Sequence, residues 1–309
     1  MQALLDVILP VFMVIGFGYL AVWKGYFSDS GVDSLMKFTQ NFAIPCMLFL
    51  AMASIDLGQS FNGPALASFY AGSLCGFMLG LFGSRLIFGR GWEDAVVIGF
   101  CCLFSNSVLL GLPLTERAYG ADSLSVNYAI IAIHAPFCYG IGIMAMETVR
   151  SMGESLFETI SKALRAMLSN ALIIAIGLGF VANLAGIAIP ETLNQAMEML
   201  ARAALPVALF GLGGVLANYR PEGDLKVVFY ICAVSLVLHP MITSGLGNAF
   251  GLTVDAMRSS VLTASMAPGI NGYIFASIYG KAKRVAATSV LVATAMSVLT
   301  VWLWLGTLP

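Results

Sequence analysis

Charged residues are scarce in this 309-residue chain. Only 10% of the residues are Asp, Glu, Lys or Arg, whereas 59% are apolar, and the mean hydropathy is +0.91. A soluble protein of this length needs more polar side chains to cover its surface, so the composition predicts lipid as the main solvent. The net charge of -1 supplies no basic surface for nucleic acid. These shortages predict one integral membrane domain over residues 1–309 and no nucleic-acid partner.

The chain also lacks the groupings that support catalysis or metal binding. It has two histidines, and its six cysteines lie inside apolar stretches without metal-ligand spacing. We interpret the cysteines as small core residues; they are Cys46, Cys75, Cys101, Cys102, Cys138 and Cys232. Neither paired carboxylates inside an apolar run nor a Ser/His arrangement is present. The sequence therefore predicts a protein that is not an enzyme, with no metal site and no cofactor.

Long apolar runs recur along the chain. Hydrocarbon offers no water to unpaired backbone groups, so spanning segments are helices or barrel strands, and these runs are too long for strands. At about 20 residues per crossing, the sequence predicts an all-α membrane protein with ten transmembrane helices. The predicted spans lie near residues 5–23, 33–53, 64–88, 95–117, 124–146, 166–185, 193–217, 227–249, 257–279 and 285–306. Because no Lys or Arg precedes Lys24, we expect the first run to be a retained helix rather than a secretory signal.

Lys and Arg residues collect on one side of this topology. Cytoplasmic loops and helix ends retain positive charge, and three of the fifteen basic residues, Arg117, Arg202 and Arg258, fall near the opposite side. Both termini are therefore predicted on the non-cytoplasmic side, with the longest loop, from Glu147 to Lys162, inside. The other twelve basic residues are Lys24, Lys37, Arg85, Arg90, Arg150, Lys162, Arg165, Arg220, Lys226, Lys281, Lys283 and Arg284.

An internal repeat emerges when the sequence is shifted along itself by about 161 residues. The matches are Ile15-Gly16-Phe17-Gly18 with Ile176-Gly177-Leu178-Gly179, Pro45 and Leu48-Phe49 with Pro206 and Leu209-Phe210, Asp94-Ala95 with Asp255-Ala256, and, after one residue of slippage, Tyr119-Gly120 with Tyr279-Gly280. Apolar sequences match easily by chance, but one offset holds across four helices. Five spans per half is an odd number, so repeat 1 (about 1–150) and repeat 2 (about 160–309) are predicted to be inverted, as in secondary carriers.

Two predicted spans carry helix breakers near their centres. The fourth contains Ser105-Asn106-Ser107 and Gly111-Leu112-Pro113, and its repeat mate, the ninth, contains Pro268-Gly269-Ile270-Asn271-Gly272. Proline removes a helix hydrogen bond and glycine lets the chain leave helical geometry, so both spans are predicted to unwind. Unwound backbone is tolerated only where protein buries it or a watery cavity solvates it. Two breaks at equivalent positions predict a binding site.

The predicted breaks favour an anionic ligand. Half-helix N-termini direct N–H groups and a positive dipole end toward the crossing, and the amides of Asn106 and Asn271 add donors without a fixed charge. Alternatively, each asparagine caps its own half-helix or joins neighbouring helices. The candidate substrate-binding residues are Ser105, Asn106, Ser107, Gly111, Pro113, Pro268, Gly269 and Asn271.

Further polar and helix-breaking residues lie inside other spans. Pro45 and Pro206 are predicted to kink the second and seventh helices and to shape the cavity wall. Asn41, one turn before Pro45, either pairs with carbonyls freed by the kink or lines the cavity. His134 and His239 each either carry a coupling proton or donate to a neighbouring carbonyl.

Two pairs of charged positions receive structural interpretations. Glu198 and Arg202, four residues apart on the seventh helix, are predicted to form a structural ion pair. Asp94 and Asp255 stand at predicted helix starts, so we expect each carboxylate to cap the N–H groups of its own helix.

Three motifs resemble signatures of the auxin efflux carrier family, which includes the plant PIN-FORMED carriers and bacterial proteins described as malonate transporters. Asn106-x4-Gly111-x-Pro113-Leu114 resembles the fourth-helix signature of the family. The ninth-helix signature is similar to Asn271-x-Tyr273-Ile274-Phe275-Ala276-x2-Tyr279-Gly280, and the second-helix one to Asn41-Phe42-x2-Pro45-x2-Leu48-Phe49. The resemblance covers essentially the whole chain.

The resemblance implies a fold like those of bile acid/sodium symporters and NhaA-type sodium/proton carriers, in the bacterial inner membrane. It implies scaffold helices 1, 2, 6 and 7, a moving transport domain of helices 3–5 and 8–10, and commonly a homodimer. It also implies that Asn106 and Asn271 contact an anionic substrate beneath the broken helices. One departure is Ala267, which separates Met266 from Pro268 and leaves the unwinding point of the ninth helix open.

Together these observations predict a carrier for a small organic anion, such as the carboxylate malonate, that works by elevator-type alternating access. The coupling ion stays open between Na⁺, H⁺ and none. The alternative is a membrane sensor that binds a small ligand without transport, although the predicted cytoplasmic segments are too short for an effector domain.

Overall fold

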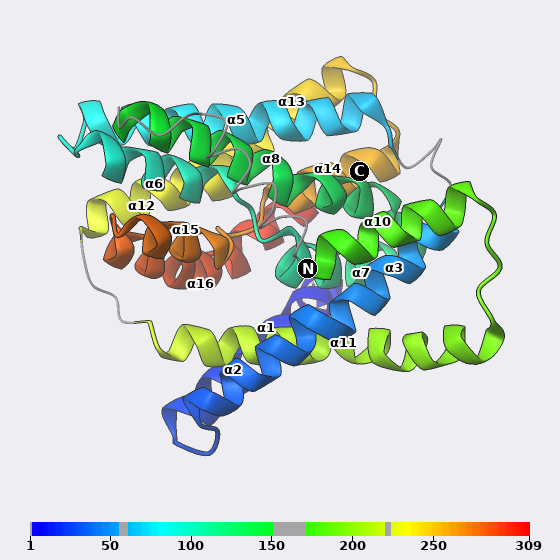
Figure 1. The fold of residues 1–309 in the computed structure, drawn as a ribbon. Coiled ribbons are helices and arrows are strands. Elements are labelled where there is room, and N and C mark those ends of the chain that lie inside the picture. Colours follow the sequence, from blue (N-terminus) through cyan, green and yellow to red (C-terminus); the bar gives the residue numbers. More distant parts are fainter. Residues whose placement is uncertain (1, 56–60, 151–170, 220–223) are drawn as a thin grey trace. The chain divides into compact units, whose positions relative to one another are not determined.

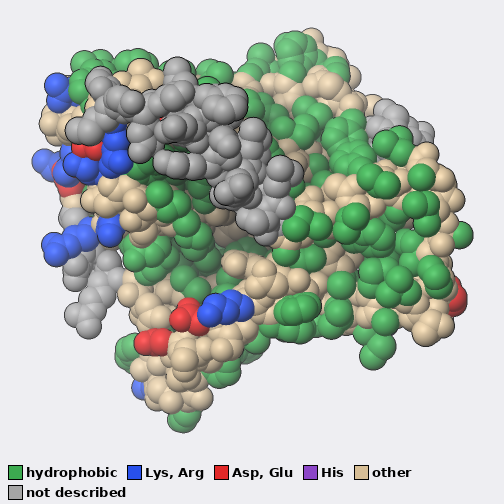
Figure 2. Space-filling model, viewed as in Figure 1, with side chains coloured by type: hydrophobic (Ala, Val, Ile, Leu, Met, Phe, Trp, Pro, Cys, Tyr) green, Lys and Arg blue, Asp and Glu red, His purple; other side chains and the backbone are tan. Residues whose placement is uncertain are grey.

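The computed structural model describes residues 2–55, 61–150, 171–219 and 224–309 (Figure 1). Within these residues every regular element is a helix, as predicted, and the only extended feature is an isolated bridge between Ser105 and Pro268. Hydrophobic side chains cover much of the face seen in Figure 2, and charged side chains are few on it. Such a surface suits a lipid environment.

Six helical segments of the described residues are long and apolar enough to cross a membrane. They are Asp29–Ser54, Gly63–Leu86, Ser125–Arg150, Glu191–Ala217, Leu225–Ala249 and Lys283–Thr307. Two further apolar helices, Val7–Trp23 and Ala171–Leu184, are shorter. The predicted spans at 95–117 and 257–279 are interrupted near their centres. Residues 166–170 of the sixth predicted span, and the predicted loop beyond Arg150, lie outside the described residues.

The chain divides into two compact units. Among the described residues, the first unit holds 2–9, 61–150, Tyr219 and 224–309, and the second holds 10–55 and 171–218. Helix α1 (Gln2–Trp23) contributes to both. The first unit contains α5 (Gly63–Leu86), α6 (Trp92–Leu103), η2 (Ser107–Gly111), α7 (Leu112–Tyr119), η3 (Ala121–Leu124), α8 (Ser125–Arg150), α12 (Leu225–Ala233), η4 (Val234–Leu238), α13 (His239–Ala249), α14 (Val254–Ala264), α15 (Asn271–Tyr279) and α16 (Lys283–Thr307).

Close helix packing characterises the first unit. Helix α5 packs on both α6 and α13 (Figure 1). A Cβ atom at Gly80 would lie 2.8 Å from the Cα atom of Gly99, so glycine at this point lets the α5 and α6 backbones approach. Four cysteines, Cys101, Cys102, Cys138 and Cys232, are buried as expected. The core interpretation is wrong for Cys75, which is exposed on α5, and Cys46 is only partly buried.

The second unit contains α2 (Asp29–Phe38), η1 (Thr39–Ala43), α3 (Ile44–Ser54), α10 (Ala171–Leu184) and α11 (Glu191–Ala217). Glycines again mark its closest approaches. A Cβ atom at Gly18 would collide with the carbonyl oxygen of Phe210, and one at Gly179 would lie 2.7 Å from the carbonyl oxygen of Phe49. Each of these contacts is the other shifted by 161 residues, with the partners exchanged.

Three π-helical turns each end two residues before a proline. Turn η1 precedes Pro45, η2 precedes Pro113 and η4 precedes Pro240. A wider turn accommodates the missing N–H and the bulk of the proline ring without ending the helix. Pro206 differs because it lies inside the continuous helix α11. The two predicted kinks, at Pro45 and Pro206, thus lie in different local structures.

Candidate functional site

The two interrupted helices of the first unit meet at their breaks. The Asn106 N–H donates to the Ala267 carbonyl, the Gly269 N–H donates to the Phe104 carbonyl, and both N···O distances are 2.9 Å. This exchange forms the bridge between Ser105 and Pro268. Backbone groups that unwinding would leave unpaired are therefore satisfied across the crossing. The predicted pairing of the fourth and ninth spans at their breaks corresponds to a direct contact.

Four half-helix ends surround this bridge. Helices α6 and α14 end at Leu103 and Ala264, and the following half-helices begin at Ser107 and Asn271. The breaks therefore comprise residues 104–106 and 265–270. Polar backbone at two helix N-termini favours negative charge, whereas carbonyls at the two C-termini favour positive charge. The crossing can stabilise either sign of partial charge without an ionised side chain.

Asn106 has one satisfied and one unsatisfied end. Its Oδ1 accepts from the Leu109 N–H at 3.2 Å, which caps the half-helix that begins at Ser107. Its Nδ2 is buried without a hydrogen-bond partner, and the residue is 5% exposed. Capping was one of the two predicted roles, and it leaves the amide donor available. A buried donor without a partner costs about 1–3 kcal/mol, so it indicates a place for an acceptor.

The second asparagine is oriented by a tyrosine from another helix. Tyr139 of α8 donates its hydroxyl hydrogen to Asn271 Oδ1 at 3.0 Å, and its ring packs against Phe100 and Phe104. This bond fixes the orientation of the Asn271 amide. Sequence reasoning missed Tyr139, because a tyrosine in a long apolar helix carries no motif of its own.

The remaining candidate residues take different places around the breaks. Ser105 and Ser107 are buried, and the Ser105 hydroxyl has no hydrogen-bond partner. Pro268 and Gly269 lie in the bridge itself. Gly111 and Pro113 lie beyond the first break: Gly111 ends η2, and Pro113 is the second residue of α7. The fourth predicted span thus unwinds at Ser105-Asn106, and Pro113 lies in regular helix.

Both histidines are buried and bonded to backbone carbonyls. His134 Nε2 lies 3.2 Å from the Ser105 carbonyl oxygen, and His239 Nε2 lies 3.2 Å from the Phe69 carbonyl oxygen. Because a carbonyl oxygen only accepts, each Nε2 carries the proton in these bonds. The ring of Phe69 is near both imidazoles, with centroid distances of 5.6 and 5.0 Å. This geometry matches the donor role proposed for each histidine; a proton-coupling role stays a prediction.

Three candidates belong to the second unit. Asn41 is exposed in turn η1, Pro45 is partly buried at the start of α3, and Pro206 is exposed on α11. Their proposed part in shaping a cavity stays a prediction.

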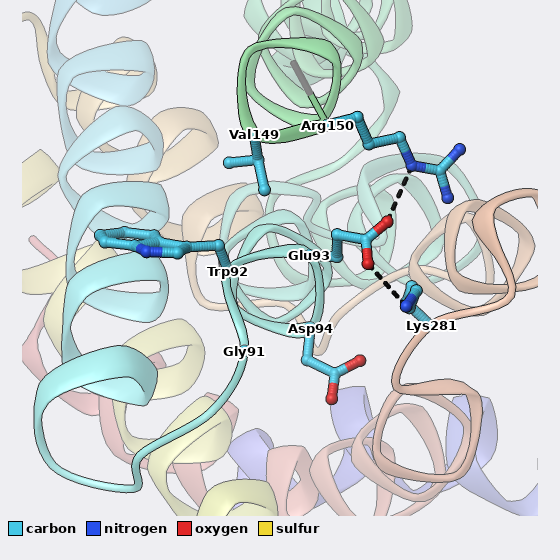
Figure 3. A pocket seen from close by; sticks show the side chains of 7 residues that line it. All are labelled: Gly91, Trp92, Glu93, Asp94, Val149, Arg150 and Lys281. Carbon is cyan, nitrogen blue, oxygen red and sulfur yellow. Dashed lines mark hydrogen bonds and ion pairs between the residues drawn. The ribbon is translucent and has the colours of Figure 1, made fainter. Parts of the chain in front are cut away.

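A charged pocket of about 380 Å³ lies elsewhere in the first unit (Figure 3). Its carboxylates and cations come from three places: the first turn of α6, the end of α8 and the turn between α15 and α16. The lining residues are Gly91, Trp92, Glu93, Asp94, Val149, Arg150 and Lys281.

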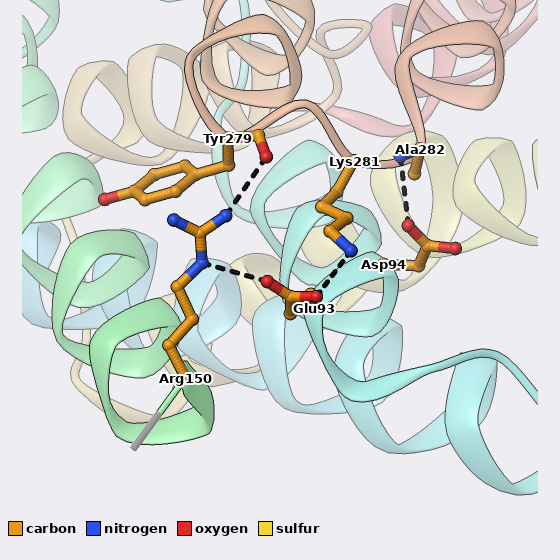
Figure 4. Close-up of polar contacts among 6 residues, drawn as sticks. All are labelled: Glu93, Asp94, Arg150, Tyr279, Lys281 and Ala282. Atoms are coloured by element: carbon orange, nitrogen blue, oxygen red, sulfur yellow. Dashed lines mark hydrogen bonds and ion pairs between the residues drawn. The ribbon is translucent and has the colours of Figure 1, made fainter. Parts of the chain in front are cut away.

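The charges of this pocket largely compensate one another (Figure 4). Glu93 Oε1 accepts from Arg150 Nε at 2.9 Å, and Oε2 lies 2.6 Å from Lys281 Nζ. The hydrogen bond from Lys281, with a further one from Arg150, lowers the pKa of Glu93. Arg150 also donates to the Tyr279 carbonyl at 3.1 Å. The cluster therefore links the start of α6 to the ends of α8 and α15.

Asp94 and Asp255 are not the helix caps that the sequence predicts. Asp94 Oδ1 accepts from the Ala282 N–H at 3.0 Å, where Ala282 adopts a left-handed conformation with φ of 44°. The residues that cap α6 and α14 are Gly91 and Thr253. Asp255 instead lies 3.7 Å from Arg258. A long-range contact, which a single helix pattern does not reveal, occupies the Asp94 carboxylate, whereas Asp255 pairs with a residue of its own helix.

Apolar helices of membrane-spanning length and two broken helices that cross define a multi-pass membrane protein, of the kind that places irregular backbone around a transport site. Comparison with known families gives the particular assignment. The family described as Membrane transport protein matches residues 3–305. The chain belongs to this family, the auxin efflux carrier family, and is a membrane transporter.

Individual relatives agree with this assignment. The chain is 25% identical over 305 residues to "Uncharacterized transporter YfdV" of Escherichia coli (strain K12). The aligned stretch covers 96% of this chain and 95% of that protein. It is 26% identical over 314 residues to "Putative malonate transporter" of Rhizobium meliloti (strain 1021), covering 97% and 94%. A 109-residue stretch is 30% identical to "Auxin efflux carrier component 4" of Arabidopsis thaliana, covering 34% and 17%.

Proposed function

We propose that this transporter is a carrier for a small organic anion, a carboxylate such as malonate, across the cytoplasmic membrane. The observation that carries the proposal is the Asn106 Nδ2 group, a buried donor without a partner at the crossing of two half-helices. Hydrogen bonds from neutral amides and helix N-termini stabilise a carboxylate without burying a second charge. The name of the Rhizobium meliloti relative, which refers to malonate, adds independent support.

The proposed mechanism is elevator-type alternating access. One compact unit contains both broken helices, and the other contains α2, α3, α10 and α11. This division parallels the expected transport helices 3–5 and 8–10 and scaffold helices 1, 2, 6 and 7. The exchanged contacts of Gly18 with Phe210 and of Gly179 with Phe49 support an inverted repeat. In our proposal, the first unit moves across the membrane together with the bound substrate, so that the crossing of its broken helices is open to one face and then to the other.

Transport by the purified protein in proteoliposomes tests the substrate class. We expect saturable uptake of labelled malonate or of another small mono- or dicarboxylate, and no uptake of the corresponding neutral amide. Imposed Na⁺, proton and voltage gradients, applied one at a time, identify the coupling. Absence of saturable flux for every anion in a broad panel, with a folded protein, would contradict the proposal. Light scattering on the solubilised protein measures whether it is the homodimer that the family resemblance implies.

The variant Asn106→Asp tests whether the buried Nδ2 donor of Asn106 binds the substrate. Aspartate preserves the size and the Oδ1 cap but replaces the free amide donor with a second acceptor. We expect anion uptake to fall about tenfold to hundredfold, since a hydrogen bond to a charged group contributes about 1.5–3 kcal/mol. Asn248→Asp, at an exposed position near the end of α13, is the matched control and should transport normally. Equal uptake by Asn106→Asp and the wild type would show that the Asn106 Nδ2 group does not bind the anion, and would contradict the main argument for the proposed function.

A further inference from the structure

Arg202 is an exposed cation inside a predicted membrane span. It lies on α11, four residues before Pro206, and its side chain is 81% exposed. A guanidinium that faces hydrocarbon costs about 2.5–3.5 kcal/mol at a helix centre and less toward the membrane surface, so this position disfavours contact with lipid tails. The sequence after it, from Ala203 to Ala217, contains no charged residue. Arg202 is therefore expected to face water rather than hydrocarbon.

The ion pair of Arg202 leaves the guanidinium available. Its nearest carboxylate, that of Glu198, is 3.6 Å away at the i, i+4 position. The other oxygen of Glu198 accepts from Asn194 Nδ2 at 2.8 Å. Exposed pairs of this kind contribute only a few tenths of a kcal/mol. A substrate carboxylate, which binds a guanidinium through two parallel hydrogen bonds, competes readily with such a partner.

Arg202 belongs to one exposed stripe of α11. Gln195, Met199, Arg202 and Pro206 follow one another at helical spacing and are all exposed. Their mates at the 161-residue offset are Ser34, Phe38, Asn41 and Pro45; the first three are exposed and Pro45 is partly buried. Both stripes belong to the second unit.

The two helices differ in charge at two matched positions, one turn apart. Arg202 in the second repeat corresponds to the neutral Asn41 in the first. One turn further from the proline, Glu198 corresponds to Lys37. If the repeats are inverted, the two stripes begin at opposite faces of the membrane. The charge difference therefore distinguishes one face from the other.

We propose that Arg202 is a docking residue that receives the substrate carboxylate on one face of the membrane before the substrate reaches the crossing. This inference rests on the proposed function, because it concerns an anionic substrate. The lysine and arginine distribution assigns that face to the non-cytoplasmic side. Asn41, at the equivalent position of the other face, supplies no charge.

Transport measured from each face separately tests this role. In right-side-out and inside-out vesicles, the variant Arg202→Asn, which copies the repeat mate, should raise the KM for the anion about tenfold from one face only. The maximal rate and the KM from the other face should stay within twofold. Because exposed charges are screened, the effect should shrink as ionic strength rises. Lys37→Gln, which removes an exposed cation one turn before Asn41, should leave the KM from the affected face unchanged.

Two reciprocal variants keep the test decisive if Arg202→Asn folds poorly. Asn41→Arg should lower the KM from the opposite face, and Glu198→Gln should lower it from the Arg202 face by releasing the guanidinium. A structural ion pair predicts otherwise: Arg202→Asn and Glu198→Gln would both lower thermal stability and change neither KM on one face alone. That result would overturn the docking role while wild-type transport persists. A wild type that transports no anion would instead refute the proposed function.

Discussion

The two asparagine amides at the crossing are held by different partners. The Asn106 amide caps its own half-helix through Oδ1, whereas Asn271 Oδ1 accepts from the Tyr139 hydroxyl. In both residues the amide oxygen is occupied, and the Asn106 nitrogen is buried without a hydrogen-bond partner. In the proposed carrier each asparagine is an oriented donor, and its orientation depends on atoms outside the asparagine itself. We therefore predict that Tyr139 positions the second amide.

The variant Tyr139→Phe tests this positioning role. Phenylalanine keeps the ring packing but removes the hydroxyl, so the Asn271 amide loses the bond that fixes its orientation. We expect the KM for the anion to rise about threefold to tenfold, from the roughly 1 kcal/mol of one neutral hydrogen bond. The thermal unfolding temperature should change little.

The matched control is Tyr70→Phe. The Tyr70 hydroxyl donates to the Ile130 carbonyl at 2.8 Å, so its loss removes a bond to backbone rather than to a candidate ligand group. We expect lower thermal stability with an unchanged KM. Equal effects of the two variants on KM would show that Tyr139 has no special relation to the substrate.

At the scale of elements, the break positions were only partly predictable. Ser105-Asn106 and Pro268-Gly269 identify the crossing because polar and helix-breaking residues in an apolar run need partners. Pro113 suggested a break that the structure places elsewhere, because the π-helical turn η2 accommodates the proline. The Glu93 cluster was not predictable either. Its partners Arg150 and Lys281 are distant in sequence, and only the assembled helices bring them together.

The Glu93 cluster predicts a pH-dependent stability. Lys281 and Arg150 lower the pKa of Glu93 in the folded protein. The resulting stabilisation is complete above the ordinary glutamate pKa of about 4.3 and is lost as the pH falls through the lowered folded-state pKa. At pH 7, Glu93→Gln should reduce the free energy of unfolding by about 1 kcal/mol. The difference from the wild type should shrink toward pH 3, as followed by thermal unfolding in detergent.

Asp255→Asn provides the control for this measurement. Asp255 occupies the first turn of the other broken helix, but its side chain is 76% exposed and lies 3.7 Å from Arg258. Its replacement should alter stability less than that of Glu93. A Glu93→Gln protein with the same pH profile as the wild type would mean that the ion pairs do not stabilise the fold.

At the scale of the whole molecule, composition and family motifs were sufficient to predict a helical membrane transporter. The 161-residue offset predicts inverted halves, and this arrangement stays a prediction; the contacts at Gly18 and Gly179 are related by the same offset with their partners exchanged. The units cut across the repeats, since each unit contains helices from both halves. A repeat in sequence therefore does not reveal which helices form one compact body.

Side-specific labelling of repeat mates tests the inverted topology directly. Ser34 and Gln195 are mates at the 161-residue offset, and both are exposed near the starts of predicted spans. In a background in which the exposed Cys75 is replaced by serine, single cysteines are introduced as Ser34→Cys and Gln195→Cys. Because inverted halves enter the membrane from opposite faces, a membrane-impermeant maleimide should label Gln195→Cys in intact cells and Ser34→Cys only after permeabilisation. Labelling of both from the same face would exclude inverted repeats and, with them, the proposed sidedness of Arg202.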